Sequence, residues 1–341
     1  MEFLRYKKLK LLILIFILGM FLQSCFGNYS GNEKDVSENL SGSGTESNSS
    51  NWKGTQLLGT SSSDGGRSVK VDSLNNLYIT GSTGGGLDGN THSGSWDIFL
   101  VKYNSLGTKQ WTRQLGSSSH EIGYGVTVDL SDNLYVTGYT VGGLDGYTNS
   151  GGIDIFLVKY NSSGVKQWTK QFGTSESEIG NGITVDSSNN IYITGYTYGG
   201  LDGNTNSGKQ DIYLVKYNSS GVKQWTKQLG TSSHEVGYWD GITVDSSNNI
   251  YVTGYTHGGL DGNTFSGGSG DIFLVKYNSN GTKQWTRQLG TSEQDLGFGV
   301  TVDSSDNIYL TGYTSGGLDG NTNSGNSDIF LGKYNSDGVL Q

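Results

Sequence analysis

The chain has 341 residues and a formal net charge of −9, with 56 glycines, 21 tyrosines, 7 tryptophans, no proline and one cysteine. The negative charge disfavours contact with phosphate backbones, so nucleic acid is not an expected partner. A single cysteine also excludes a disulfide within the chain. Gly, Asn, Asp and Ser must form the turns, and abundant Tyr, Trp, Thr, Ile and Val predict an all-β protein.

The first 24 residues have the pattern of a bacterial export signal. Basic residues precede an apolar run at 11–22, which is shorter than the roughly 20 residues needed to span a bilayer. Cys25 follows directly, and the residues before it resemble the lipobox of spirochaete lipoproteins. We predict a signal peptide at 1–24, acylation of Cys25 and a flexible tether at 25–51. The expected location is the bacterial envelope, at the outer membrane or cell surface, with an ordinary signal peptide as the alternative.

Residues 52–341 contain five copies of one unit. The leucine of "GGLDG" recurs about every 58 residues. The repeating pattern has four runs with the composition and boundaries of strands, which in the second unit are 125–129, 133–140, 154–161 and 166–173. The third run carries apolar residues on both faces, so its sheet must pack between two other sheets.

Four-stranded sheets that cover one another on both faces describe a β-propeller. The last unit lacks a fourth run, and the segment 51–59 near the start of the chain resembles that run. We expect this segment to pair with 328–335. The pairing would close a ring of five blades with four antiparallel strands each.

Two repeated residues have a structural interpretation. A glycine falls inside every second strand, which indicates a bulge or a close backbone approach. These glycines are Gly81, Gly138, Gly195, Gly254 and Gly312. The tryptophan of each fourth strand, such as Trp168, is expected to pack between blades, with sugar stacking as the alternative.

Residues 154–197, "DIFLVKYNSSGVKQWTKQFGTSESEIGNGITVDSSNNIYITGYT", resemble the bacterial β-propeller repeat family known as SBBP. Repeats of that family join D-x-F-[LV]-x-K-[YLF] to GV-x-VD-x-x-x-N-x-Y-[VIL]-TG. The resemblance implies a propeller fold and an extracellular or surface location. It implies no common catalytic activity, because one fold hosts many functions.

Long connections between second and third strands, and between one unit and the next, should emerge on one face, where binding usually resides. Each copy places acids in these connections. The candidate ligand-binding acids are Asp88, Asp145, Asp202, Asp261, Asp319, Glu121, Glu178 and Glu235. The alternative is that each carboxylate caps its own loop.

The segment "DGNTNSGKQD" offers oxygen ligands from Asp202, Asn204, Asn206 and Asp211, which makes calcium a weak candidate there. Aromatic residues that break the repeat, namely Tyr147, Phe265 and Trp239, are further binding candidates. The four histidines lie in loops of different copies without a catalytic motif. We therefore expect no catalytic residues, no enzymatic activity and no cofactor.

Together these features predict a membrane-anchored surface lipoprotein that presents a β-propeller as a binding module for protein or glycan ligands. A structural envelope protein without a specific ligand is the alternative. A hydrolase or lyase acting on polysaccharides is the third reading.

Overall fold

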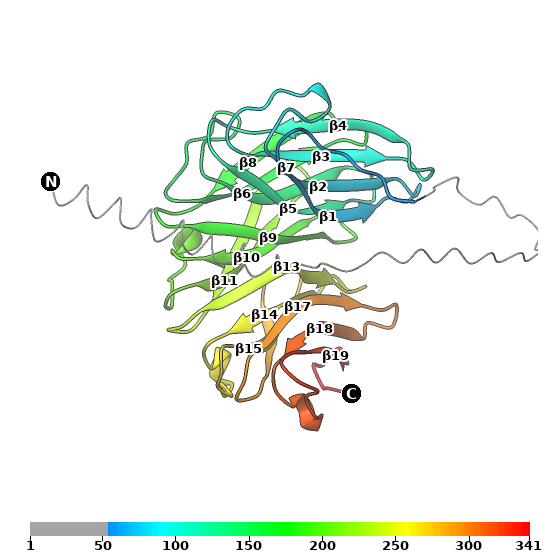
Figure 1. Cartoon of the computed structure of the whole chain (residues 1–341). Coiled ribbons are helices and arrows are strands. Elements are labelled where there is room, and N and C mark those ends of the chain that lie inside the picture. The colour runs from blue at the N-terminus through cyan, green and yellow to red at the C-terminus, as the bar shows by residue number, and fades with distance from the viewer. Residues whose placement is uncertain (1–53) are drawn as a thin grey trace, which may run out of the picture. The chain divides into compact units, whose positions relative to one another are not determined.

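The computed structural model describes residues 54–341, except the side chain of Trp239, and the regular structure in them is almost entirely β-strand (Figure 1). The predicted signal peptide, Cys25 and the tether lie outside the described residues. The described part of the chain is all-β and forms five successive antiparallel sheets, called blades 1 to 5. The only helical elements in it are single 3-10 turns: η1 (Leu87–Gly89), η2 (Leu201–Gly203), η3 (Leu260–Gly262) and η4 (Leu318–Gly320).

The strands follow the predicted order within each blade. Blade 1 contains β1 (Asp64–Val71), β2 (Leu77–Thr83), β3 (Asp97–Tyr103) and β4 (Lys109–Leu115). Blade 2 contains β5 (Glu121–Val128), β6 (Leu134–Thr140), β7 (Asp154–Tyr160) and β8 (Lys166–Phe172). Blade 3 contains β9 (Glu178–Val185), β10 (Ile191–Thr197), β11 (Asp211–Tyr217) and β12 (Lys223–Leu229). Blade 4 contains β13 (Glu235–Val244), β14 (Ile250–Thr256), β15 (Asp271–Tyr277) and β16 (Lys283–Leu289). Blade 5 contains β17 (Asp295–Val302), β18 (Ile308–Thr314) and β19 (Asp328–Tyr334).

The first strand of each blade packs beside the first strand of the next, from β1 through β17. Blades 4 and 5 are also joined by a parallel bridge between Asp240 and Gly299, so their seven strands form one continuous sheet. The first strands are therefore the inner strands of the stack, and the fourth strands form its outer edge.

Each inner strand carries a β-bulge opposite the glycine of the second strand. In blade 3, Gly180 lies opposite Gly195 and Gly182 lies opposite Thr194, which leaves Asn181 as the extra residue. A Cβ atom on Gly195 would lie 1.9 Å from the carbonyl oxygen of Ile179. Both parts of the prediction, a bulge and a close backbone approach, are confirmed.

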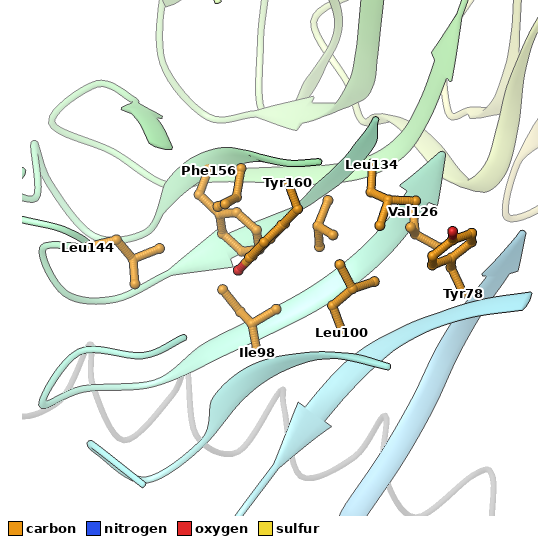
Figure 2. Packing of buried hydrophobic residues seen from close by; sticks show 10 residues of the cluster. Tyr78, Ile98, Leu100, Val126, Leu134, Leu144, Phe156 and Tyr160 are labelled. Atoms are coloured by element: carbon orange, nitrogen blue, oxygen red, sulfur yellow. The ribbon is translucent and has the colours of Figure 1, made fainter. Parts of the chain in front are cut away.

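Apolar side chains fill the space between successive blades. Figure 2 shows Tyr78, Ile98 and Leu100 of blade 1 beside the blade 2 side chains, among them Phe156. Phe156 belongs to this cluster, whereas its neighbour Ile155 belongs to the cluster between blades 2 and 3. Both faces of the third strand are therefore buried, as its sequence predicts.

Each outer tryptophan packs between blades. A Cβ atom on Gly221, in the β11–β12 turn of blade 3, would lie 2.9 Å from the Trp168 ring of blade 2. The Trp168 ring also lies near Tyr135, with ring centroids 6.1 Å apart. These contacts confirm the structural interpretation of the tryptophans.

The turn between the first and second strands is built around one aspartate. In blade 3 the carboxylate of Asp186 accepts hydrogen bonds from the backbone N of Ser188 (2.9 Å), from the backbone N and Nδ2 of Asn190 (both 2.8 Å), and from Oη of Tyr192 (2.8 Å). This network explains the spacing D-x-x-x-N-x-Y in every copy. The Asp carboxylate accepts hydrogen bonds within the turn, and the Asn and Tyr side chains donate to it.

The equivalent network in blade 5 makes stability depend on pH. The Asn307 side chain, together with backbone N–H groups, holds the pKa of Asp303 at about 2, below its ordinary 3.8. Because the folded-state pKa is lowered, the stabilisation is present above the unfolded-state pKa and is lost as the pH falls from about 4 to 2. Urea unfolding across this range should therefore show wild type losing more stability than Asp303→Asn. Asp337→Asn, a change in an exposed turn of the same blade, serves as the control and should follow wild type. Parallel curves for wild type and Asp303→Asn would contradict the prediction.

The described residues do not form the predicted closure of the ring. Residues 54–59 form no strand, and Leu58 packs instead against the blade 1 cluster that contains Leu87 and Phe99. β19 pairs with β18 on one edge, and Ile329 and Leu331 are 88% and 75% exposed. Residues 51–53 lie outside the described residues. Figure 1 shows β1 and β19 near opposite ends of the stack. Residues 54–59 do not form the predicted pairing, because they are not a strand and β19 pairs with β18 alone among the described strands.

Candidate functional site

The acids at the start of the inner strands are buried below the preceding loops. The carboxylate of Glu178 accepts hydrogen bonds from the backbone N and Oγ1 of Thr174 (both 2.7 Å) and from Oγ1 of Thr197 (2.9 Å). Glu121 and Glu235 are equally buried and hold the same loop atoms in their blades. Burial raises the pKa of Glu178. The structure thus places these predicted ligand-binding acids beneath the rim of the loop-rich face, where they anchor loops.

The acids of the "LDG" turns lie at the surface but are engaged within their own blade. Nζ of Lys223 lies 2.7 Å from Oδ1 of Asp202, and Oγ1 of Thr226 donates to Oδ2 (2.5 Å). Asp202 has a φ of 51°, a left-handed conformation that Asp tolerates better than most residues. The same ion pairs join Lys109 to Asp88, Lys166 to Asp145 and Lys283 to Asp261, and Asp319 has the same φ in blade 5. These acids fix the turn.

The calcium candidates point to separate partners. Besides the Asp202 contacts above, Nδ2 of Asn204 donates to the carbonyl of Leu201 (2.7 Å), and Oδ1 of Asn206 accepts from the backbone N of Gly208 (3.0 Å). Asp211 is buried. Residues 54–341 contain no group of three or more His, Cys, Asp or Glu side chains suited to a metal ion. In this conformation Asp202, Asn204 and Asn206 have separate local partners, and calcium binding stays a prediction.

The pattern-breaking aromatics lie in different places. Tyr147, in the β6–β7 loop of blade 2, donates its hydroxyl to the carbonyl of Thr169 (3.0 Å). Phe265 lies half-buried in the β14–β15 loop of blade 4. Trp239 belongs to the inner strand β13, and its side chain is outside the described residues. Tyr147 and Phe265 thus belong to blades that are not neighbours.

A more continuous surface forms from the bulged residues of the inner strands, which the loop-based prediction missed. They occupy the variable position of a repeated G-x-G or closely related frame: Arg67, Tyr124, Asn181, Tyr238 and Phe298. Several touch across blades. The guanidinium of Arg67 lies 5.2 Å from the Tyr124 ring centroid, and the Tyr238 and Phe298 rings meet edge to face at 4.8 Å.

Second-strand tyrosines extend this surface. The Tyr124 and Tyr139 ring centroids are 5.7 Å apart, and those of Phe298 and Tyr313 are 5.5 Å apart. In blade 4, the Tyr238 and Tyr255 centroids are 5.6 Å apart. We call the following residues the inner aromatic surface: Tyr124, Tyr196, Tyr238, Tyr255, Phe298 and Tyr313, together with the buried Tyr139 that packs against Tyr124.

Tyr196 contributes a tyrosine from blade 3, and its ring lies edge to face with that of Tyr198, with ring centroids 6.1 Å apart. Burial raises its pKa, and the nearby hydroxyl groups of four other tyrosines raise it further. These neighbours are Tyr198, Tyr124, Tyr255 and Tyr139. Tyrosines of three successive blades therefore act together on the pKa of Tyr196, and its phenol is protonated at neutral pH.

Polar side chains border the inner aromatic surface on the loop-rich face. The His120 ring stacks on Tyr139 with an interplanar angle of 11°. Nδ1 of His234 donates to Oε1 of Gln210 (2.6 Å), and Nε2 of Gln210 donates to Oη of Tyr198 (2.8 Å). Burial lowers the pKa of both His120 and His234, so both rings are neutral at pH 7. The border thus offers uncharged donors and acceptors.

A signal for this surface is present in the sequence. The glycine before the x position recurs in all five copies, whereas x itself is Arg, Tyr, Asn, Tyr or Phe. Within repeats, a constant frame indicates a structural need, and a variable residue inside it is free to serve another role. Finding the surface also required knowing that the frame is a bulge on the inner strand.

Five segments of the chain match the family described as Beta-propeller repeat (SBBP): residues 53–88, 110–145, 167–202, 224–261 and 284–319. The uncharacterised WD repeat-containing protein L264 of Acanthamoeba polyphaga mimivirus is 28% identical over 320 residues, covering 70% of this chain and 23% of that protein. The regulatory protein FlaEY of Caulobacter vibrioides is 24% identical over 218 residues, covering 56% of this chain and 22% of that protein. The chain therefore spans less than a quarter of either relative.

Among solved structures, the gluconolactonase XC5397 of Xanthomonas campestris aligns with a TM-score of 0.40 and 12% identity, covering 84% of this chain and 87% of that one. A Bacteroides caccae protein of unknown function aligns with a TM-score of 0.41 and 8% identity, covering 73% and 69%. Likeness at this level carries no functional argument. No helical turn in residues 54–341 has the length and apolar character of a membrane-spanning helix. Because the five repeat matches together cover more than half of the sequence, the chain belongs to the SBBP β-propeller repeat family.

Proposed function

We propose that this protein is a membrane-anchored surface lipoprotein whose repeat domain is a binding module, and that its ligand is a glycan held on the inner aromatic surface. The observation that carries the proposal is that three variable residues, Tyr124, Tyr238 and Phe298, gather with second-strand tyrosines into one aromatic surface. The second-strand tyrosine recurs in blades 2 to 5, so the variable residues are what distinguish one blade from another on this surface. Anchoring through Cys25 is supported by the residues preceding that cysteine.

The chemistry of the surface favours a sugar over a charged ligand. Aromatic ring faces can cover the apolar faces of pyranose rings, and the bordering amide, imidazole and phenol groups can pair with hydroxyl groups. Phe298 is 37% exposed, so the surface is accessible at its blade 5 end. The net charge of −9 disfavours anionic ligands. We therefore expect a neutral oligosaccharide.

The test begins with a glycan array, followed by calorimetric titration of the sugar that binds. Phe298→Ala should weaken binding about tenfold, because stacking by one aromatic ring contributes on the order of 1.4 kcal/mol. Tyr147→Ala, which removes a partly exposed aromatic from a loop of blade 2, is the matched control and should bind as wild type does. Unfolding curves of both variants separate lost binding from lost structure.

Three results would count against the proposal. An array without a binding sugar would reject the glycan ligand. Loss of binding in Tyr147→Ala but not in Phe298→Ala would move the site to the loops. Retention of a Cys25→Ser variant in the membrane fraction would reject the anchor.

A further inference from the structure

The interfaces between successive blades repeat one arrangement. We call the face of a blade that packs against the next blade in the chain its forward face. The face that packs against the preceding blade is its backward face. The forward face of blade 4 contains Tyr251, Ile272 and Leu274, and all three are buried. They pack against the backward face of blade 5, which contains Val300, Ile308, Leu310, Leu318, Phe330 and Tyr334.

Polar contacts repeat across the same interfaces. The lysine of each third strand donates to a turn carbonyl of the next blade, for example Nζ of Lys276 to the carbonyl of Ser336 (2.9 Å). Equivalent bonds join Lys102 to Ser162, Lys159 to Ser219 and Lys216 to Ser279. In the inner turns, the backbone N of Ser246 in blade 4 donates to Oδ1 of Asp306 in blade 5 (3.1 Å). Each interface therefore has an apolar centre and directional polar contacts.

At one end of the stack, the forward face of blade 5 has no following blade. Its apolar residues are Tyr309, Ile329 and Leu331, the counterparts of the buried residues in blade 4. Ile329 is 88% exposed and Leu331 is 75% exposed. Lys333 and the backbone N of Ser304 correspond to Lys276 and the backbone N of Ser246 in blade 4, which donate hydrogen bonds to blade 5.

At the other end, the backward face of blade 1 is only partly covered. Val69 and Val71 on β1 are 54% and 51% exposed, whereas their counterparts in blade 2 are the buried Val126 and the partly buried Val128. A groove on this face is lined by Leu58, Ile79, Phe99 and Val101, among others. On this face the carbonyl of Ser105 and the side chain of Asn75 correspond to the acceptors of blade 5, which are the carbonyl of Ser336 and the carboxylate of Asp306.

The segment before β1 prepares the backward face for an incoming blade. Leu58 precedes Gly59 as Leu115, at the end of the fourth strand of blade 1, precedes Gly116. Leu115 packs against the cluster between blades 1 and 2, and Leu58 packs against the cluster of blade 1 in the same way. Leu58 therefore takes the place of a fourth-strand residue from a preceding blade. Blade 5 has no fourth strand among the described residues. The end of the stack at blade 1 therefore carries a fourth-strand residue that the end at blade 5 lacks.

We propose that the forward face of blade 5 binds the backward face of blade 1 in a second copy of this chain. The contact is heterologous, because two different surfaces meet, and it can build a ring or an open row of copies. It buries Ile329 and Leu331 against the second copy's groove, as their counterparts are buried inside the molecule. Lys333 and Ser304 then donate to Ser105 and Asn75 of the second copy.

Sedimentation velocity of the purified full chain at physiological salt tests this assembly. The apparent mass of wild type should at least double as the concentration rises through the micromolar range. A forward-face variant, Ile329→Asp with Leu331→Asp, and a backward-face variant, Val69→Asp with Val71→Asp, should each remain monomeric. These side chains are at least half-exposed, so the variants should fold, and circular dichroism checks this. Leu130→Asp, a change at an exposed leucine in a blade 2 turn, should associate like wild type.

Mixing the two variants gives the sharper result. Each retains the face that the other has lost, so the mixture should form one-to-one dimers and nothing larger. Wild type that stays monomeric at every concentration would overturn the proposal and favour closure within one chain. If only one of the two variants loses association, the contact joins identical faces or a different surface, and the proposal fails.

Discussion

Gly312→Ala is expected to lower the free energy of unfolding by about 3 kcal/mol or more. A Cβ atom at this position would lie 1.9 Å from the carbonyl oxygen of Leu296 and 2.9 Å from Cε1 of Phe330. The first contact is with backbone, which cannot move without disturbing the β17–β18 ladder and the bulge at Phe298. Urea unfolding monitored by tryptophan fluorescence measures the change.

Gly299→Ala is the matched control, because Gly299 lies in the same blade on the strand that pairs with β18. A Cβ atom on Gly299 would have no neighbour closer than 3.5 Å. Alanine there should change stability by less than about 1 kcal/mol. Equal effects of the two substitutions would show that the bulge tolerates a side chain, contrary to the observed backbone approach.

Glu178→Ala is expected to cost about 3 kcal/mol of stability. It would leave the backbone N and Oγ1 of Thr174 without their acceptor, and the Thr197 hydroxyl with only the carbonyl of Gly199 (3.0 Å). An unsatisfied buried polar group costs about 1–3 kcal/mol, and part of that cost is recovered if water enters the space. Glu178→Gln keeps an acceptor oxygen and removes a buried charge, so its effect should be smaller than that of alanine. Thermal or chemical unfolding of both variants checks this order.

Asp202→Ala provides the comparison between a loop anchor and a surface acid. Its ion pair with Lys223 is partly exposed, and such pairs contribute about 1 kcal/mol or less. The cost of this substitution should therefore be clearly below that of Glu178→Ala. A Glu178→Ala variant that is as stable as wild type but deficient in glycan binding would show that the buried acids bind the ligand and do not anchor loops.

Much of each blade can be predicted from the residues of one repeat. The alternation in the third strand predicts two buried faces, and Phe156 and Ile155 indeed belong to different interblade clusters. The glycine of the second strand predicts a bulge or a close approach, and the structure has both. These features depend on neighbours a few residues away or on the adjacent strand, so the local sequence carries them.

The candidate site was harder to predict. Acids such as Glu121 and Asp145 recur in loops, and their polarity suggests exposure, but their partners are Ser117 and Lys166 of the same blade. Tyr124 and Tyr196 lie inside strands, whereas the sequence-based prediction placed ligand binding in the long loops. Only the arrangement of blades brings such residues together, because their separation in the chain is about one whole repeat.

The pattern within one repeat was sufficient for the strand order, the turn networks and the packing of one blade on the next, since each depends on contacts that recur in every copy. The meeting of Tyr238 with Phe298, and the distance between the two ends of the stack, depend on the rotation from blade to blade. That rotation accumulates over four interfaces, so a small difference at each one decides whether Leu58 and Ile329 meet in the same chain. The sequence of one repeat does not determine the total rotation over four interfaces, and only the tertiary structure shows it.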